Sequence, residues 1–392
     1  MKHQLLCLLF LFLSLSAQTQ YKQLSPNSKI SVLTIGPGTS LNDSFGHSAY
    51  RVKDSLMDIV FNYGVYDFDT PNFYTKFAQG KLNYKIGANY FEDFRESYIN
   101  QNRTIKEQVL NLSLDEKQRV FNYLSKNYEP ANQYYLYDFF YDNCATKIRD
   151  VLLISLNDSI IFNKPESFQP KTFRSLIQQN LKWNSWGSLG IDLALGSVID
   201  RKATPVEYMF LPEYIHDFFG SAIIQTDPEK KLVKNEKVIY QYKKNNLSDN
   251  FLLSPLFILG IIGLLIIYFT AIDHKKNKRS KWLDLLLFII TGLIGIVILL
   301  LWFATDHEAT AQNYNLLWAF AINLFMILQV LKSRPSTWFR KYLKFLIIMI
   351  CLLTLHWIIG IQRFAFGLIP LLMAMTIRYL YLINFYKKQA AI

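Results

Sequence analysis

Long apolar runs fill the chain from residue 251 onward, and they constrain its fold more than any other feature. Five runs are almost wholly apolar, at residues 251–272, 283–303, 316–331, 345–361 and 366–386. A helix that crosses the roughly 30 Å hydrocarbon core of a bilayer needs about 20 such residues, and each run reaches or approaches that length. The second half of the chain is therefore predicted to be an all-α bundle of about five transmembrane helices.

The charges between these runs predict their orientation. Two of the connecting loops are basic, with Lys275, Lys276, Lys278, Arg279 and Lys281 in one and Lys332, Arg334, Arg340, Lys341 and Lys344 in the other. The loop 304–315 has no Lys or Arg. Because basic loops stay in the cytoplasm, residues 18–250 are expected outside and the C-terminus inside. The net charge of +12 largely reflects this arrangement, and we expect no nucleic-acid partner.

The N-terminus has the three parts of a secretory signal within residues 1–17. Lys2 is followed by the apolar stretch Leu5–Leu13 and by a region of small residues suited to cleavage. The apolar stretch is too short to be a permanent span, so we expect its removal. The chain then divides into an outer domain, residues 18–250, and a transmembrane domain, residues 251–392.

The outer domain is long enough to bury one sizeable core and mixes strand and helix signals. Strands are predicted at residues 29–35, 45–52, 57–64, 81–90 and 103–112. A helix is predicted from Leu114 to Asn127, because Ser113 and Glu116 form a capping box before it. Further helices are predicted from Cys144 and at 205–219, which makes this an α+β domain. The helix from Cys144 should bury one stripe of residues, Ile148, Val151, Leu152 and Leu156.

Cys144 is the one cysteine between the N-terminal signal and the first apolar run. The other two are Cys7, inside the signal, and Cys351, inside an apolar run. A chain exported to an oxidising compartment normally pairs its cysteines or lacks them. Cys144 also stands at a predicted helix N-terminus, where partial positive charge favours the thiolate. The position favours a reactive thiol, with Asp142 expected to cap the helix.

A nucleophilic thiol needs a base, and the outer domain holds two histidines, His47 and His216. His47 lies on the first strand of a predicted hairpin, whereas His216 lies among aromatic residues, where a surface or core role is expected. With the hairpin turn centred between residues 54 and 55, His47 would face Asn62, which would then orient the imidazole. A shift of one residue would bring Tyr63 there instead.

Plainer interpretations of these residues stay open. A lone cysteine in a helix is often a small apolar core residue, and a strand histidine is often structural. The histidine and cysteine spacings match no usual metal site, so neither a metal nor another cofactor is expected. Near the outer membrane surface, Asp306 and His307 are candidates for binding a lipid headgroup or assisting the active site, although loops between spans are often simply polar.

Several segments spread over the chain resemble one known family. They are Ser31–Pro37, Ser44–His47, Phe61–Phe68, Tyr137–Thr146, Asp192–Gly196, Ala203–Pro212, Asp306–His307 and Asn315–Trp318. Together they resemble the Lnb family of bacterial lipoprotein N-acyltransferases, and the resemblance covers nearly the whole mature chain. The order of a strand histidine before a helix cysteine is also similar to circularly permuted papain folds of the NlpC type, which include the lecithin–retinol acyltransferases.

The resemblance implies a membrane-bound thiol acyltransferase of the bacterial inner membrane with a periplasmic domain. Such an enzyme would move an acyl chain from a phospholipid, through a Cys144 thioester, to the α-amino group of a diacylglyceryl-cysteine on a lipoprotein. His47 would be the base and Asn62 its orienting partner. The Cys144 N–H and a second, unidentified donor would bind the oxyanion.

Two other functions remain open at this stage. The first is a cell-wall cysteine peptidase or amidase that uses Cys144 and His47 on a peptide, in which case an outer domain cut off near Asn250 should act on soluble muropeptides. The second is a non-enzymatic membrane sensor or assembly factor whose thiol is incidental, in which case Cys144→Ser should be silent.

Overall fold

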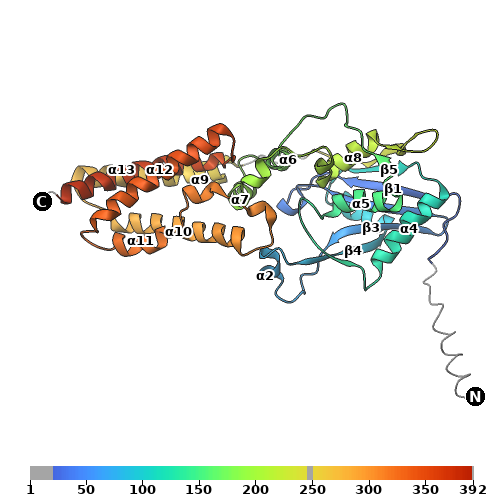
Figure 1. Ribbon diagram of the computed structural model, residues 1–392, viewed down its shortest axis with the longest axis horizontal. Helices are drawn as coiled ribbons and strands as arrows, with labels where there is room; N and C mark the ends of the chain where they lie inside the picture. The colour runs from blue at the N-terminus through green and yellow to red at the C-terminus, as the bar shows by residue number, and fades with distance from the viewer. Residues whose placement is uncertain (1–20, 245–249, 391–392) are drawn as a thin grey trace, which may run out of the picture.

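The computed structural model describes residues 21–244 and 250–390. An outer domain of strands and helices and a bundle of long helices lie end to end (Figure 1). The predicted signal, residues 1–17, lies outside the described residues, as do residues 245–249 in the segment that joins the two parts.

The outer domain is built on an antiparallel sheet of seven strands in the order β10-β5-β1-β2-β3-β4-β6. These are β1 (Lys29–Ile35), β2 (His47–Asp54), β3 (Met57–Val65), β4 (Asn83–Tyr90), β5 (Ile105–Leu110), β6 (Tyr134–Leu136) and β10 (Val233–Tyr240). A small second sheet joins β7 (Ile160–Ile161), β8 (Ile223–Ile224) and β9 (Lys230–Lys231). All five predicted strands are confirmed with small shifts at their ends. Strand β10 was not predicted from the sequence, because this edge strand is mostly exposed and polar.

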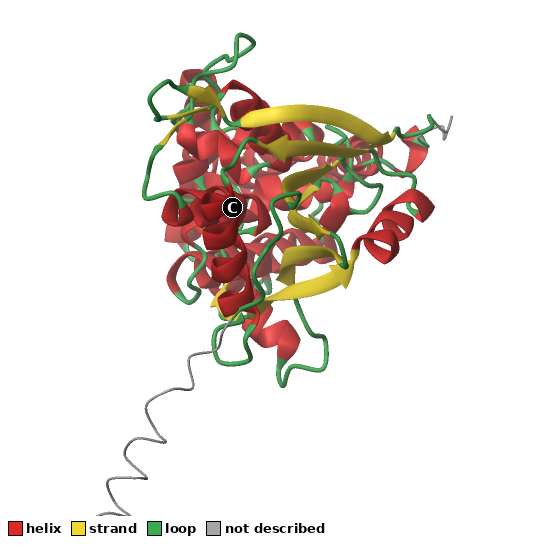
Figure 2. Cartoon of the chain, turned by 90° about the vertical axis from the view of Figure 1, so that its right-hand side faces the viewer, coloured by secondary structure: helices red, strands yellow, loops and turns green. Residues whose placement is uncertain are grey.

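Helices cover both faces of this sheet, which forms one curved layer when viewed along the long axis (Figure 2). The helices of the outer domain are α2 (Phe73–Ala78), α3 (Phe91–Asn100), α4 (Leu114–Tyr128), α5 (Cys144–Ser155), α6 (Phe173–Gln179), α7 (Trp186–Ala194) and α8 (Pro212–Ser221). On one face, Tyr50 and Tyr63 pack in the same core as Ile148 of α5. On the other, Val60 packs against Phe94 of α3. Alternate residues of each strand therefore serve two separate cores.

Local signals account for several of the helix boundaries. Ser113 and Glu116 form the predicted capping box of α4. All four residues of the predicted apolar stripe on α5 are buried. The predicted helix at 205–219 is instead broken into a 3₁₀ turn, Val206–Phe210, and α8. Leu211 between them is extended, as expected for the residue before a proline, here Pro212.

Four helices of the described bundle are long and apolar enough to cross a membrane. They are α9 (Pro255–Lys276), α10 (Lys281–Phe303), α12 (Thr337–Ile359) and α13 (Ile369–Gln389). They correspond to the first, second, fourth and fifth apolar runs of the sequence, so these four predictions agree with the structure.

The prediction of a continuous helix at 316–331 was wrong. The chain there forms a 3₁₀ turn, Tyr314–Leu317, then an irregular stretch, and then the eight-residue helix α11, Asn323–Val330. The irregular stretch lies against Gly295 of α10, where a Cβ atom would be 2.2 Å from the carbonyl oxygen of Ala319. An interrupted helix is tolerated at membrane depth where protein surrounds it.

This broken segment still runs from one end of the bundle to the other. At its start, Asn313 accepts a hydrogen bond from Gln362 at 3.3 Å, in the loop that joins α12 to α13. At its end, the carbonyl oxygen of Val330 accepts one from Arg279 at 2.9 Å, in the loop that joins α9 to α10. The bundle therefore has a fifth passage in addition to its four long helices.

The outer domain packs against the end of the helix bundle that faces it, through hydrogen bonds and an apolar contact. The amide of Asn315 donates to the carbonyl oxygen of Asp192 at 2.9 Å, and the Gly196 N–H donates to the carbonyl of Ala309 at 2.9 Å. Leu189 of α7 is part of the apolar core of the bundle. These contacts set the position of the outer domain over the membrane surface.

Candidate active site

Cys144 is the first residue of α5, and the residue before it caps the helix. The side chain of Asn143 accepts hydrogen bonds from the N–H groups of Ala145 at 2.8 Å and Thr146 at 3.0 Å. Its own amide donates to the carbonyl oxygen of Phe210 at 2.8 Å, which ties the cap to the domain core. Asp142, the expected cap, instead pairs with Lys147 at 2.6 Å. The Cys144 thiol therefore stands at a rigid helix N-terminus.

His47 and Asn62 come together on neighbouring strands, although not in the predicted register. The β2–β3 pairs run from Tyr50 opposite Phe61 to Asp54 opposite Met57, so the centre of the turn lies one residue later than predicted and the partner of each β2 residue shifts by two. Continued to the end of β2, this register puts His47 beside Gly64. The Nε2–H of His47 nevertheless donates to Oδ1 of Asn62, since residues two apart on a strand share a face.

Cys144 and His47 line the same cavity, close enough for each to shift the pKa of the other. Gly64 lies beside Cys144, since a Cβ at this glycine would be in ordinary contact with the Cβ of Cys144 at 3.7 Å. Gly64 also has a φ of +93°, a conformation that other residues rarely adopt. The α5 N-terminus and the start of β2 therefore meet beside a glycine.

The surroundings favour the charged forms of both groups. Burial by itself raises the pKa of Cys144, but the nearby charge of His47, its hydrogen bond and the N–H groups of Ser48 and Ala145 lower it below the ordinary value. Burial by itself lowers the pKa of His47, while Cys144 and the hydrogen bond to Asn62 raise it overall. A thiolate paired with an imidazolium is the reactive form of a thiol nucleophile.

Tyr98 of α3 packs on the imidazole from its other side and Arg103 packs on Tyr98, and neither residue was predicted from the sequence. The Tyr98 ring stacks on His47 with centroids 6.3 Å apart. The Arg103 guanidinium lies over Tyr98 at 4.9 Å and donates to the carbonyl oxygen of Gly36 at 2.9 Å. No local pattern marked these residues, because the contact of Tyr98 with His47 depends on how α3 folds back onto the sheet.

Cys144 and His47 open into a cavity of about 540 Å³ whose walls are largely aromatic. The rings that line it include Tyr66, Phe68, Phe73, Tyr74, Phe77 and Tyr84. None of its lining residues is an Asp, Glu, Lys or Arg. The volume is within the range of small-ligand sites, and the walls suit an apolar ligand.

The loop that follows α10 reaches this cavity. His307 lines it and donates from Nε2 to the carbonyl oxygen of Phe77 at 3.0 Å. Asp306 makes a backbone contact, in which its N–H donates a hydrogen bond to the carbonyl oxygen of Gln79 at 2.9 Å. Of the two residues predicted to bind substrate, the structure thus brings His307 to the cavity wall, while Asp306 makes a backbone contact to the segment after α2.

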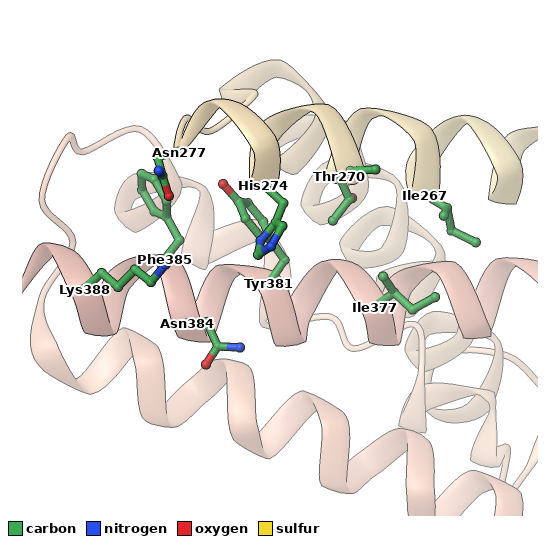
Figure 3. Close-up of a pocket in the computed structure, with 10 residues that line it drawn as sticks. Ile267, Thr270, His274, Asn277, Ile377, Tyr381, Asn384, Phe385 and Lys388 are labelled. Atoms are coloured by element: carbon green, nitrogen blue, oxygen red, sulfur yellow. The ribbon is translucent and has the colours of Figure 1, made fainter.

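Other chemically active residues lie elsewhere. His216 is buried and contacts Glu236 at 3.1 Å and Asp217 at 3.4 Å. A second cavity of about 300 Å³ lies between α9 and α13, with His274 and Lys388 on its walls but no cysteine (Figure 3). The described residues contain no group of three or more side chains suited to hold a metal ion. In the Cys144 cavity, by contrast, a cysteine, a histidine and a binding volume coincide.

Two family models match the chain. The Lnb N-terminal periplasmic domain matches residues 16–179, and the Lnb transmembrane domain matches residues 246–389. Between them they leave an internal stretch unmatched, residues 180–245, besides the two chain ends. No curated protein and no solved structure matches the chain significantly.

Proposed function

The chain belongs to the Lnb family, which implies a role in lipoprotein N-acylation, and on this premise we propose that it is a lipoprotein N-acyltransferase working through a Cys144 thioester. The acyl donor is a membrane phospholipid, and the acceptor is the α-amino group of a diacylglyceryl-cysteine at a lipoprotein N-terminus. The observation that carries this proposal is the pairing of Cys144 with His47 at the wall of a largely aromatic cavity that has no Asp, Glu, Lys or Arg in its lining.

The first half of the reaction loads the enzyme. His47 holds the proton of Cys144, and the thiolate attacks an ester carbonyl carbon of the phospholipid to form a C–S bond. The ester C–O bond then breaks, and the leaving alkoxide takes the proton from His47 and departs as lysophospholipid. Asn143 occupies the N–H groups of Ala145 and Thr146, while the Cys144 N–H is left to face the oxyanion.

The second half transfers the acyl chain. The α-amino group of the lipoprotein attacks the thioester carbonyl carbon and forms a C–N bond. The C–S bond breaks, and the amine proton passes to His47, which restores the paired thiolate and imidazolium. Asn62 keeps the imidazole in one orientation through both halves, because it holds Nε2 and leaves Nδ1 for Cys144.

The fold and the membrane topology that we propose for this function rest on His47, Cys144 and the basic loops. A strand histidine preceding a helix cysteine, on an antiparallel sheet, is the arrangement of a permuted NlpC-like papain domain. The basic loops after the first and third membrane passages favour a cytoplasmic C-terminus and an inner-membrane location. The periplasmic domain then faces the outer leaflet, where both lipid substrates reside.

Mass spectrometry of the intact protein after incubation with phospholipid vesicles, without acceptor, tests the proposal. We expect one acyl adduct on Cys144, labile to neutral hydroxylamine, with release of lysophospholipid. The adduct should be absent in Cys144→Ala and His47→Ala and retained in Cys351→Ala, which removes the exposed cysteine of α12. An unmodified Cys144 in folded protein would overturn the thioester mechanism.

A further inference from the structure

The segment between β3 and β4 carries an unusual number of exposed aromatic side chains. This aromatic segment, Tyr66–Gly80, includes Tyr74, which is 78% exposed, Phe68, which is 64% exposed, and Phe77, which is 54% exposed. The same three side chains line the Cys144 cavity. Each ring therefore has one side toward the cavity and another toward the surroundings. Clustered exposed aromatic rings on a protein surface mark an interaction site.

The aromatic segment is attached to the outer end of a membrane helix. Its carbonyl oxygens at Phe77 and Gln79 accept the hydrogen bonds from His307 and from the Asp306 N–H. These two donors follow directly after α10, which ends with the stacked rings of Trp302 and Phe303. Aromatic residues at the ends of membrane helices sit at the level of the lipid headgroups. Figure 1 likewise shows α2 beside the outer end of α10.

Three observations thus coincide in one short segment: exposed rings, a place at the membrane surface and contact with the nucleophile's cavity. We propose that the aromatic segment inserts into the outer leaflet and is the port through which the acyl chain of a glycerophospholipid reaches Cys144. This inference rests on the proposed function, which it deepens by naming the surface that takes up the donor lipid. It places the port in the outer domain rather than among the membrane helices.

The chemistry of the cavity selects the acyl chain as its occupant. The charged forms of Cys144 and His47 are paired with each other, and the cavity walls carry no Asp, Glu, Lys or Arg, so a charged headgroup or a charged peptide would lose its hydration without one of these side chains as an ionic partner. An acyl chain carries no charge that must be desolvated, and its transfer from water into an apolar cavity is favourable. The headgroup of the donor therefore stays at the mouth, while the ester carbonyl follows the chain inward to Cys144.

Insertion is measured independently of catalysis by fluorescence quenching. Tyr74→Cys, in a Cys144→Ala and Cys351→Ala background, is labelled with bimane, and the protein is placed in nanodiscs of phosphatidylcholine with or without brominated acyl chains. We expect brominated lipid to reduce the emission at least twofold. The matched control is Leu56→Cys in the same background, because Leu56 is 92% exposed at the β2–β3 turn, and its emission should not change. Equal emission at position 74 in both lipids would overturn the proposal.

Uptake of the donor is measured by the rate at which vesicle phospholipid forms the Cys144 adduct. Phe68→Ser and Tyr74→Ser should each lower this rate at least tenfold, whereas Leu56→Ser should not. Alkylation of Cys144 by iodoacetamide, a small soluble reagent, is measured on the same samples. If the variants lost alkylation to the same extent, the slower adduct formation would come from lower reactivity of Cys144, and the proposal would be overturned. Adduct formation at the wild-type rate would also overturn it.

The two measurements separate this inference from the function on which it rests. If the wild-type protein forms no adduct from any phospholipid, the thioester mechanism fails, and quenching at position 74 still decides whether the segment enters the bilayer. If the adduct forms but position 74 is not quenched, the mechanism stands and the port lies elsewhere.

Discussion

The imidazole of His47 is held by the side-chain oxygen of Asn62 across a diagonal of the β2–β3 hairpin. The strand register would place Gly64, not Asn62, beside His47. The side chain of Asn62 reaches His47 because residues 62 and 64 point to the same face of the sheet. Nε2 is thereby committed to Asn62, and Nδ1 is left for Cys144. The orientation of the imidazole therefore depends on one amide oxygen.

Asn62→Ala should lower the rate of adduct formation on Cys144 about 100-fold, the order of loss expected when a catalytic group is misplaced by about 1 Å. Asn62→Asp keeps an acceptor and should lose less. The matched control is Tyr63→Phe, because Tyr63 points to the opposite face of the sheet, into the core beneath α5. If Asn62→Ala formed the adduct at the wild-type rate, Asn62 would have no role in orienting His47.

The pH dependence of thiol alkylation tests the electrostatic pairing. The pKa of Cys144 is lowered from its ordinary value, chiefly by His47 acting against burial. The rate of reaction with iodoacetamide should therefore rise at a lower pH than for an ordinary thiol. In His47→Ala the largest of the effects that oppose burial is lost, so the pKa of Cys144 should rise. At pH 7 the variant should react at least tenfold more slowly, since one pKa unit changes the thiolate fraction tenfold.

Both proteins in this comparison carry Cys351→Ala, so that Cys144 is the one thiol measured in the mature chain. The rates are followed by mass spectrometry between pH 5 and 10. Superimposable profiles for the two proteins would mean that His47 does not stabilise the thiolate.

Much of this site could be predicted because its components are local. Cys144 follows a recognisable polar turn, and His47 and Asn62 lie on strands whose residues alternate. The parity of the hairpin was right and put both side chains on one face, but the register was wrong. The two-residue turn Ser55–Leu56 contains none of the Gly, Asn or Asp residues that usually fix a hairpin turn, so nothing local marked its centre.

The rest of the site depends on contacts between distant segments. Helix α2 is six residues long, and its first turn has no side-chain cap, so no sequence signal marked it. The attachment of Gln79 to Asp306 joins residues from two different domains. Likewise, the interruption in the third apolar run follows a contact with Gly295, which hydropathy does not register.

His307→Ala removes the side-chain hydrogen bond that holds the aromatic segment to the membrane loop. The loss of one such bond is worth about 1 kcal/mol, so adduct formation from vesicles should fall about fivefold. His307→Gln keeps a donor and should recover part of the rate. Alkylation of Cys144 by iodoacetamide, measured alongside, should stay near the wild-type rate. A loss as complete as that of His47→Ala would instead place His307 in the chemistry.

Gly196→Ala should separate the outer domain from the membrane loop. A Cβ at this position would lie 1.8 Å from the carbonyl oxygen of Ala311, so the backbone must move. We expect a lower melting temperature in detergent and faster proteolysis near residue 196. The matched control is Gly190→Ala on α7, where a Cβ meets nothing within 4 Å. That change should be neutral or slightly stabilising, because alanine favours a helix over glycine. Equal stability of the two variants would contradict the tight junction.

Gly295→Ala tests the interrupted passage through the bundle. The position lies where α10 meets the irregular stretch, and a Cβ would be 2.2 Å from the Ala319 oxygen and 2.5 Å from the Ala321 nitrogen. Because both neighbours are backbone atoms, no side chain can rotate away, and the segment must shift as a unit. Overpacking of this kind costs about 1–3 kcal/mol. The variant should therefore melt at a lower temperature than the wild type in detergent.

Gly260→Ala is the control for this change, since it lies on α9 and its added Cβ would meet nothing within 4 Å. Both glycines lie within long membrane helices and receive the same substitution, but only at Gly295 does the added methyl group meet neighbouring backbone atoms. If Gly295→Ala and Gly260→Ala had the same melting temperature, the interrupted segment between α10 and α12 could not lie against Gly295 as the structure has it. A continuous helix packed at ordinary distance, as the apolar run alone suggested, would then be the better description.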